Sequence, residues 1–458
     1  MFNKEIYIAR RKALVEKMRG EGGIIVFIGN VDAAAQYTNN AYKWRQDSTW
    51  LYFFGIDEPR YAAVLDIDSG TETIYADDAD LDDVIWNGPT PSVAEYAAAG
   101  GITKTACYRD LEQAVGMAQC AGRKVHTIPP SRYYNKIRLS QLSIWDSSEA
   151  LIKAIISMRL VKTPEEIEAI DFACDLGYEM HTRARKGIAL GKIEQEIVGD
   201  MESVALSRGW GVSFPTILTQ HGEVFHCHDH GAAIAPGKLL VIDAGVESNE
   251  HYASDFTRTY PTGGKFTSKQ RDIYQIVCDC NEAAFAMTAP GVRYRDVHLA
   301  VNRMMLERFT QLGLVSGDVD AMMEEGIAGL FMPHGLGHNM GMDVHDMEDY
   351  GEDLVGYDDD QKRSPLLGLG SLRMARKLIP GNVVTDEPGI YFIPALIEKW
   401  KADGKGKDFV NFDKLKEYYD FGGIRLEDDV LVTETGARRL GRKRLPITPD
   451  EVEAAMAE

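Results

Sequence analysis

The sequence predicts a two-domain protein, with an α/β domain over residues 1–158 and an α+β domain over residues 159–458. The length is the first indication, because 458 residues exceed what one small core organises. The first third alternates helical patterns with short apolar strands such as GIIVFIG, AAVLDI and ETIYA, as α/β domains do. The rest begins with long helical patterns and then carries most of its polar motifs on predicted strands, which indicates an α+β domain.

The domain boundary is placed at residues 155–162, where the segment LVKTPEEIEAI begins. There, Thr163 is the predicted N-cap of a helix and Glu166 completes a capping box. A second capping box, formed by Thr267 and Gln270, predicts the start of another helix. Further helical pattern is expected over residues 295–330.

Strands are expected in five segments of the second domain. KLLVIDAG and HYASDFTRTY are predicted to pair around the polar turn ESNE, and further strands are expected at MPHGLGH, NVVTDEPGIYF and GGIRLEDDVLVTE. The acidic, glycine-rich stretch MEDYGEDLVGYDDDQKRSPLLGLG is predicted to be a long loop.

Composition excludes several classes of function. The net charge of −20, from 70 acidic and 50 basic side chains, disfavours binding to nucleic acids or anionic membranes, which require basic surfaces. The N-terminal segment carries charge throughout and has no signal-peptide core. Six cysteines without a CxxC pair or a disulfide framework fit a reducing compartment, so a cytoplasmic location is expected. They are Cys107, Cys120, Cys174, Cys227, Cys278 and Cys280.

Five candidate metal ligands are spread over the second domain. They are Asp243, Asp255, His338, Glu387 and Glu427. Four carboxylates and one imidazole, with no thiolate, suit two hard or borderline divalent cations. Two such cations would balance the four negative charges, which would otherwise repel one another strongly. A water held between them could be ionised near neutral pH.

The carboxylates also have simpler interpretations. Asp243 ends an apolar strand, where aspartate is often a turn or cap residue. Glu387 precedes Pro-Gly, so it could be an exposed turn acid. Asp255 is more informative, because aspartate is disfavoured inside a strand such as DFTRTY and requires a partner there. Arg425 and Glu427 lie two apart on a strand and share a face, where an exposed ion pair is the simpler alternative.

Histidines are concentrated in two segments. His334, His338 and His345 lie within twelve residues, and the glycines between the first two make a helix improbable and indicate close backbone approach. In FHCHDH, alternating histidines beside a cysteine resemble a soft-metal site. We favour a different interpretation, in which one of His226, His228 and His230 lines a pocket and the other two are polar neighbours.

Several long segments together resemble the metal-dependent Xaa-Pro peptidases of the pita-bread fold, namely prolidase and aminopeptidase P. The segments FMPHGLGH, MDVHD, SLRMARKL, EPGIYFI and FGGIRLEDDV match the catalytic domain. YKWRQDSTWLYFFGIDEP resembles the N-terminal domain of aminopeptidase P, so the resemblance covers essentially the whole chain. It implies a creatinase/aminopeptidase-like catalytic domain with two divalent metal ions, usually manganese, which cobalt or zinc can replace.

The resemblance also implies the ligand assignment. Asp243 would chelate one metal, His338 and Glu387 the other, and Asp255 and Glu427 would bridge both. A hydroxide held between the metals would attack the carbonyl before proline.

Further roles follow from the same resemblance. His226 would contact substrate near the scissile carbonyl, while His334 and His345 would bind the proline side and stabilise the tetrahedral intermediate. Arg425 would orient Glu427, and Glu387 would also carry the proton to the departing nitrogen. Arg373, in SLRMAR, would hold the C-terminal carboxylate of a dipeptide.

The implied substrates are Xaa-Pro dipeptides or longer peptides with proline in second position. The dipeptidase is preferred, and an aminopeptidase P acting on longer peptides is the alternative. A silent peptide-binding module, a metal-free creatinase-like hydrolase and a methionine aminopeptidase are more remote. A homodimer is expected. Two departures are visible: the interval from Asp243 to Asp255 is one residue longer than usual, and Asp386 replaces a small apolar residue.

Overall fold

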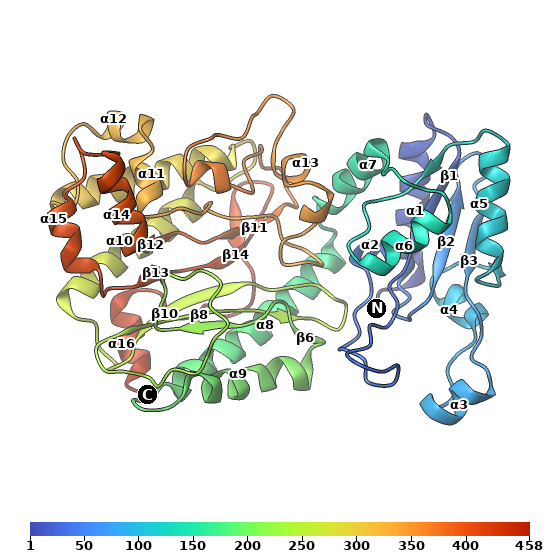
Figure 1. The fold of residues 1–458 in the computed structure, drawn as a ribbon, viewed down its shortest axis with the longest axis horizontal. Coiled ribbons are helices and arrows are strands. Elements are labelled where there is room, and N and C mark those ends of the chain that lie inside the picture. Colours follow the sequence, from blue (N-terminus) through green and yellow to red (C-terminus); the bar gives the residue numbers. More distant parts are fainter. The chain divides into compact units, whose positions relative to one another are not determined.

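The computed structural model describes residues 1–458 and divides into two compact units, residues 1–159 and 160–458 (Figure 1). No helix combines the length and the apolar character needed to span a bilayer.

The first unit is a five-stranded mixed sheet with helices, in the strand order β4-β3-β2-β1-β5. β1 pairs antiparallel with β2 and parallel with β5, and β3 pairs antiparallel with β2 and parallel with β4. Its strands are β1 (Ile24–Ile28), β2 (Ala62–Asp66), β3 (Glu72–Tyr75), β4 (Thr105–Ala106) and β5 (Val125–His126). Its helices are α1 (Lys4–Met18), α2 (Ser48–Phe54), α3 (Leu81–Asn87), α4 (Val93–Ala99), α5 (Asp110–Cys120), α6 (Tyr133–Gln141) and α7 (Glu149–Arg159).

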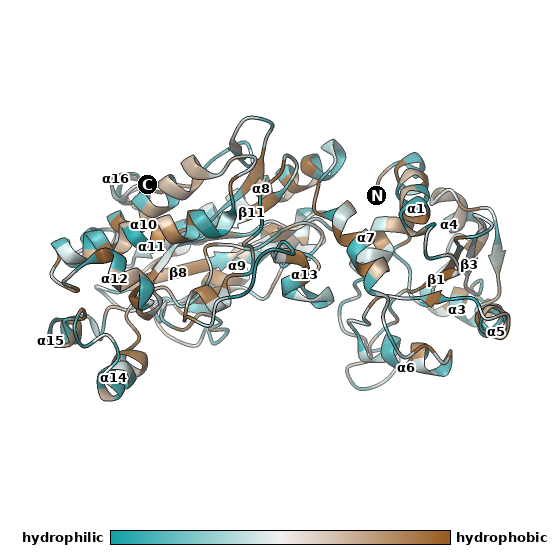
Figure 2. Cartoon of the chain, turned by 90° about the horizontal axis from the view of Figure 1, so that it is seen from above, coloured by the Kyte–Doolittle hydropathy of each residue, from teal (hydrophilic) through white to brown (hydrophobic).

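The predicted strand GIIVFIG is β1, and its side chains are almost completely buried. Figure 2 shows β1 of the first unit and β8 of the second as hydrophobic segments within their layers of helices. Helix α2 buries every one of its residues and is closed by Arg10 and Arg11, which donate to the carbonyls of Tyr52 and Phe53. The α/β character of this unit is as predicted.

The second unit combines several small sheets with long helices. Its strands are β6 (Gly211–Val212), β7 (Ile217–Thr219), β8 (Leu239–Ala244), β9 (Val246–Glu247), β10 (Phe256–Pro261), β11 (Val383–Asp386), β12 (Gly389–Tyr391), β13 (Gly423–Arg425), β14 (Asp428–Val432) and β15 (Ala437–Arg439). Its α-helices are α8 (Pro164–Gly187), α9 (Glu194–Arg208), α10 (Ser268–Met287), α11 (Tyr294–Gln311), α12 (Val319–Glu324), α13 (Glu352–Gly356), α14 (Pro394–Asp403), α15 (Phe412–Leu415) and α16 (Pro449–Met456). Short 3₁₀ helices cover Ile327–Leu330, Glu348–Tyr350, Leu369–Ser371 and Lys416–Tyr418.

Both predicted capping boxes are present. The Thr163 hydroxyl accepts from the backbone N–H of Glu166, whose carboxylate accepts from the N–H of Thr163, and α8 begins at the following proline. Thr267 and Gln270 form the equivalent pair at the start of α10. These reciprocal bonds satisfy N–H groups that a helix start leaves open.

Strand pairing brings the polar motifs of the second unit together. β8 pairs antiparallel with β10, so that Asp243 lies opposite Thr257, and Thr257 also forms an isolated bridge with Glu427. β12 pairs with β13, which places Gly389 opposite Arg425. Residues nearly two hundred positions apart therefore become neighbours on adjoining strands.

Three local predictions are wrong. The segment MPHGLGH is irregular and not a strand, because the backbone of Gly337 packs so closely on β11 that a Cβ would lie 2.0 Å from the carbonyl oxygen of Thr385. Asp255 lies just before β10 and not inside it. The acidic stretch predicted as one long loop contains α13 and two 3₁₀ helices.

Candidate active site

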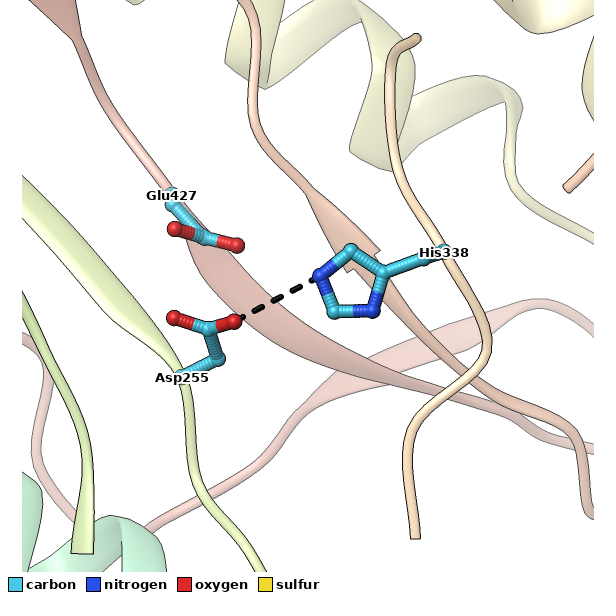
Figure 3. A group of neighbouring side chains, drawn as sticks. All are labelled: Asp255, His338 and Glu427. Atoms are coloured by element: carbon cyan, nitrogen blue, oxygen red, sulfur yellow. Dashed lines mark ion pairs between the residues drawn. The ribbon is translucent and has the colours of Figure 1, made fainter. Parts of the chain in front are cut away.

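Three of the five predicted metal ligands form one buried group. Ligand atoms of Asp255, His338 and Glu427 all lie within 4.8 Å of one another, although their backbones come from separate segments (Figure 3). The Nε2 atom of His338 is 3.4 Å from Oδ2 of Asp255 and 3.7 Å from Oε1 of Glu387. Asp243 and Glu387 line the same cavity, whose volume is 590 Å³. All five predicted ligands therefore face one space.

The acids of this group repel one another unless they bind cations or protons. Burial, followed by the charges of the neighbouring acids, raises the pKa of Asp255 and of Glu427 well above the ordinary carboxyl values. Burial also raises the pKa of Glu387. Oδ1 of Asp255 is buried and has no hydrogen-bond partner. An unpartnered carboxylate oxygen among mutually repelling acids fits divalent cations, which prefer oxygen and imidazole ligands.

Arg425 connects Asp243 to His334 through a tyrosine that the sequence analysis did not identify. Its Nη2 donates to Oδ2 of Asp243 at 2.5 Å, and its Nη1 donates to the phenol oxygen of Tyr391 at 2.8 Å. The phenol oxygen lies 2.8 Å from Nε2 of His334. Nδ1 of His334 lies 2.7 Å from the carbonyl of Gly335, so Nδ1 carries the proton and Nε2 accepts from the phenol. Burial, with the positive charge of Arg425, lowers the pKa of His334 to about 3, which keeps the ring neutral.

Two threonines orient the acidic ligands. The hydroxyl of Thr257 donates to Oε2 of Glu427 at 2.6 Å, and Nε of Arg425 donates to the same hydroxyl at 3.2 Å. Arg425 thus contacts Asp243 directly and reaches Glu427 only through Thr257, which refines its expected role. The hydroxyl of Thr385 accepts from the backbone N–H of His338 and donates to Oε1 of Glu387.

His345 lies against the metal-ligand group and leads to the outer end of the cavity. Its ring stacks on that of His338, with centroids 3.8 Å apart. Its Nδ1 is 2.9 Å from Oε1 of Glu348, whose Oε2 accepts from Nη1 of Arg373 at 2.5 Å. Burial, with the neighbouring His338, lowers the pKa of His345 to about 4. Glu348 was not identified from the sequence, since nothing in an acidic loop distinguishes one glutamate from its neighbours.

The segment FHCHDH does not gather into a site of its own. His226 and His228 line the cavity, but Nδ1 of His228 faces the carbonyl of Thr216. Nδ1 of His230 lies 3.0 Å from the carbonyl of Leu218. The Sγ atom of Cys227 is directed to the carbonyl of Asp229. These histidines therefore anchor the loop to the protein backbone and leave His226 without a hydrogen-bond partner in the cavity.

The unusual Asp386 is buried, and neither of its carboxylate oxygens has a hydrogen-bond partner. Burial raises its pKa well above the ordinary value, with the charge of Asp428 the next contribution. Asp386 ends β11, and it is absent from the cavity wall that Glu387 lines. The remaining wall is partly apolar, from Phe214, Pro215, Ile217, Phe225, Pro333 and Val344.

Comparison with known proteins agrees with this geometry. Residues 168–434 match the model of metallopeptidase family M24, and residues 7–126 match the aminopeptidase P N-terminal domain. The chain is 32% identical to the human Xaa-Pro dipeptidase, over 99% of this chain and 93% of that protein. It is 30% identical to a probable Xaa-Pro aminopeptidase of Sordaria macrospora, over 95% of this chain and 92% of the relative.

Solved structures extend the likeness to the whole fold. Escherichia coli aminopeptidase P with the inhibitor Pro-Leu superposes with a TM-score of 0.80 at 28% identity, covering 100% of this chain and 99% of that one. Pseudomonas aeruginosa aminopeptidase PepP gives a TM-score of 0.81 at 26% identity, covering 100% and 98%. The predicted fold class, an α/β domain followed by a pita-bread domain, is confirmed, and so is the resemblance to Xaa-Pro metallopeptidases. The chain belongs to metallopeptidase family M24.

Proposed function

We propose that this enzyme hydrolyses the Xaa-Pro bond with two divalent metal ions, and that its preferred substrates are Xaa-Pro dipeptides. One observation carries the proposal: five metal-type ligands face one cavity, three of them within 4.8 Å of one another, and Arg373 lines the same cavity. The relatives, which include both Xaa-Pro dipeptidases and Xaa-Pro aminopeptidases, support the bond that is cleaved.

Asp243 would hold one metal, His338 and Glu387 the other, and Asp255 and Glu427 would contact both. When bound, the two cations supply Lewis acidity, which lowers the pKa of water and polarises the scissile carbonyl. Manganese is the proposed resident metal, because the ligands are oxygen and imidazole groups; cobalt or zinc would also fit them. The raised pKa of the acids supports this assignment, since cations would offset the repulsion that raises it.

The residues of the chain perform the other tasks. Glu387 has a raised pKa, so its carboxylate is suited to take the proton of the attacking water and to pass it to the proline nitrogen. His226 borders the cavity and would donate to the developing oxyanion. His345 also borders the cavity, but its neutral ring donates its one N–H to Glu348, so its Nε2 would accept a hydrogen bond there. His334, which burial and the charge of Arg425 keep neutral, would contact the proline side.

Proline recognition would depend on shape. The nitrogen of an Xaa-Pro bond carries no hydrogen, so a site that clamps a peptide N–H cannot select it. Phe225 packs edge-on against the rings of His334 and Tyr391, with centroids 5.7 and 4.6 Å apart. This rigid aromatic corner, with Pro333 nearby in the wall, suits a pyrrolidine ring.

Arg373 is the basis for preferring a dipeptide. Its guanidinium could pair with the free carboxylate that follows proline in a dipeptide, a contact that longer peptides cannot make in the same place. Aminopeptidase P activity on longer peptides is the alternative, which the structural neighbours favour. A silent peptide-binding module is the remote alternative, because all five ligand types are retained.

Proline release after EDTA treatment and Mn²⁺ repletion tests the proposal with Ala-Pro, Ala-Pro-Ala and Ala-Ala. We expect metal-dependent cleavage of Ala-Pro and none of Ala-Ala. Arg373→Ala should raise the KM for Ala-Pro about tenfold, with less effect on Ala-Pro-Ala. Equal effects on both would make the enzyme an aminopeptidase, and a metal-loaded protein that cleaves none of them would be the binding module.

Three further assignments belong to the same proposal. The N-terminal unit is proposed as an aminopeptidase P-like domain over residues 1–158, preceding the catalytic domain. A homodimer is proposed from the resemblance, with molar mass by light scattering as its test. A cytoplasmic location is proposed from cysteine usage, since all six cysteines are free thiols in the structure.

A further inference from the structure

The outer end of the cavity contains an arginine that two glutamates already hold. Nη1 of Arg373 donates to Oε2 of Glu348 at 2.5 Å and to Oε1 of Glu352 at 2.7 Å. Both contacts use the same nitrogen, and the Nε and Nη2 atoms make no hydrogen bond in the structure. The edge of the guanidinium formed by Nε and Nη2 can therefore bind a ligand, while Nη1 is occupied by the two glutamates.

The two glutamates differ in their surroundings. Glu348 lines the cavity, its side chain is only 14% exposed, and its other oxygen faces Nδ1 of His345. Glu352 belongs to α13, is 40% exposed, and is shared with Arg363 at 3.0 Å. A charge on Glu348 therefore acts inside the cavity, whereas the charge of Glu352 is balanced by a second arginine and screened by solvent.

Close packing keeps this arrangement in place. Gly356, the last residue of α13, lies so close to the backbone of Arg373 that a Cβ there would be 1.7 Å from the carbonyl oxygen of Arg373. The N–H groups of Ala375 and Arg376 both donate to the carbonyl of Gly356. The backbone of Arg373 and the helix that bears Glu352 are thus held together, which keeps the side chains of Arg373 and Glu352 within reach of each other.

The charges at this end of the cavity have a consequence for an anionic ligand. Glu348 offsets the positive charge of Arg373 inside the cavity, while Glu352 is shared between Arg373 and Arg363. A carboxylate that binds the open edge of the guanidinium would come within a few ångströms of Glu348, and the two anions would repel each other. Arg373 would then be a weaker carboxylate receptor than an unpaired arginine.

We propose that Glu348 is a specificity-determining residue that shares Arg373 with the carboxylate following proline, and thereby weakens dipeptide binding and speeds release of free proline. The inference rests on the proposed Xaa-Pro peptidase function. A receptor that bound the carboxylate very tightly would also retain proline, which carries the same group after cleavage. Because Glu348 partly neutralises Arg373, proline inhibits the enzyme less. The KM for the dipeptide is higher for the same reason.

The experiment compares Ala-Pro with Ala-Pro-NH2, which differ only in the carboxylate, on the Mn²⁺-loaded enzyme. In Glu348→Gln, we expect the ratio of kcat/KM for Ala-Pro to that for Ala-Pro-NH2 to rise about fivefold, as one partly buried ionic contact allows. The inhibition constant of proline, measured with Ala-Pro-NH2 as substrate, should fall by a similar factor. A role of Glu348 that only orients His345 would change both substrates alike and leave the ratio unchanged.

Two variants serve as controls. Glu352→Gln removes the other contact of Arg373 outside the cavity, and the same ratio should change less than about twofold, because exposed pairs contribute little. In an Arg373→Gln background, Glu348→Gln should no longer change the ratio, since the two residues act through one contact. An effect that persists without Arg373 would overturn the proposal.

Other outcomes are equally decisive. A ratio that falls in Glu348→Gln would mean that Glu348 presents Arg373 to the carboxylate, and the proposal would be wrong. If the wild-type enzyme cleaves neither substrate, the proposed function fails, but calorimetric titration of proline still tests the inference. Tighter proline binding by Glu348→Gln than by the wild type would support it, and equal or weaker binding would refute it.

Discussion

Replacing Asp255 with asparagine should inactivate the enzyme and at the same time stabilise its metal-free form. Ligand atoms of Asp255 and Glu427 lie within 4.8 Å of each other. Two unit charges at that distance repel by about 3.5 kcal/mol at an effective dielectric constant of 20. Asparagine keeps the shape of the side chain but removes one of the charges, so the repulsion between residues 255 and 427 disappears.

The gain in stability is smaller than the full repulsion, because a buried acid can also take up a proton. At pH 8, we expect the free energy of unfolding of metal-free Asp255→Asn to exceed that of the metal-free wild type by about 1–3 kcal/mol. This corresponds to a Tm about 2–6 °C higher. With Mn²⁺ the order should reverse, since the wild type gains binding free energy that the variant largely loses.

The pH dependence follows from the direction of the pKa shift. The pKa of Asp255 is raised in the folded metal-free protein, so the folded state binds more protons than the unfolded chain above about pH 4. The stability contributed by protonated Asp255 is therefore complete below that pH and is lost as the pH rises through the folded pKa. The advantage of the asparagine variant should be absent near pH 4 and largest above neutrality.

Differential scanning calorimetry after EDTA dialysis, between pH 4 and 9, measures both effects. Asp359→Asn is the matched control, because Asp359 is exposed and lies outside the cavity, and its Tm should follow the wild type. The reasoning is refuted if metal-free Asp255→Asn is no more stable than the metal-free wild type at pH 8. It is also refuted if the difference shrinks as the pH rises.

The remaining predictions concern metal and its supporting residues. Thr257→Val should weaken Mn²⁺ binding about 10- to 100-fold in calorimetric titration, because Glu427 loses the hydroxyl that orients it; unchanged affinity would contradict this. Tyr391→Phe should lower kcat about tenfold with little change in KM, since His334 loses its donor and Arg425 its acceptor; a KM effect alone would place Tyr391 in substrate binding instead. EDTA treatment should abolish activity and Mn²⁺ should restore it, whereas activity that persists after verified metal removal would exclude the proposed centre.

Local patterns in the sequence predicted those parts of the fold that depend on local physics. The capping boxes at Thr163 and Thr267 appear as expected, because the N-cap and N3 residues satisfy each other within one turn. The pairing of KLLVIDAG with the strand of DFTRTY was also predicted, since two strand-like segments flank a polar turn.

Features that depend on distant neighbours could not be obtained in this way. HGLGH looks apolar enough for a strand, but its path is set by β11, against which Gly337 packs without room for a side chain. The direct partner of Arg425 could not be obtained from the sequence for a related reason. Sequence spacing places it beside Glu427, whereas strand pairing brings it within 2.5 Å of Asp243, 182 residues away in the chain.

A single residue, Thr257, explains why so dispersed a ligand set becomes one site. Its backbone lies opposite Asp243 in the β8–β10 pair and forms a separate bridge with Glu427, so one position on β10 sets the spacing of two ligand-bearing segments. Its hydroxyl then donates to Glu427 and accepts from Arg425, which holds Asp243. Because pairing on both sides uses the same residue, a shift of one position on either side would separate the acids and turn alternate side chains away from the cavity. The strand register at Thr257 therefore brings the acids together, and the cations that would bind there would offset the repulsion between them.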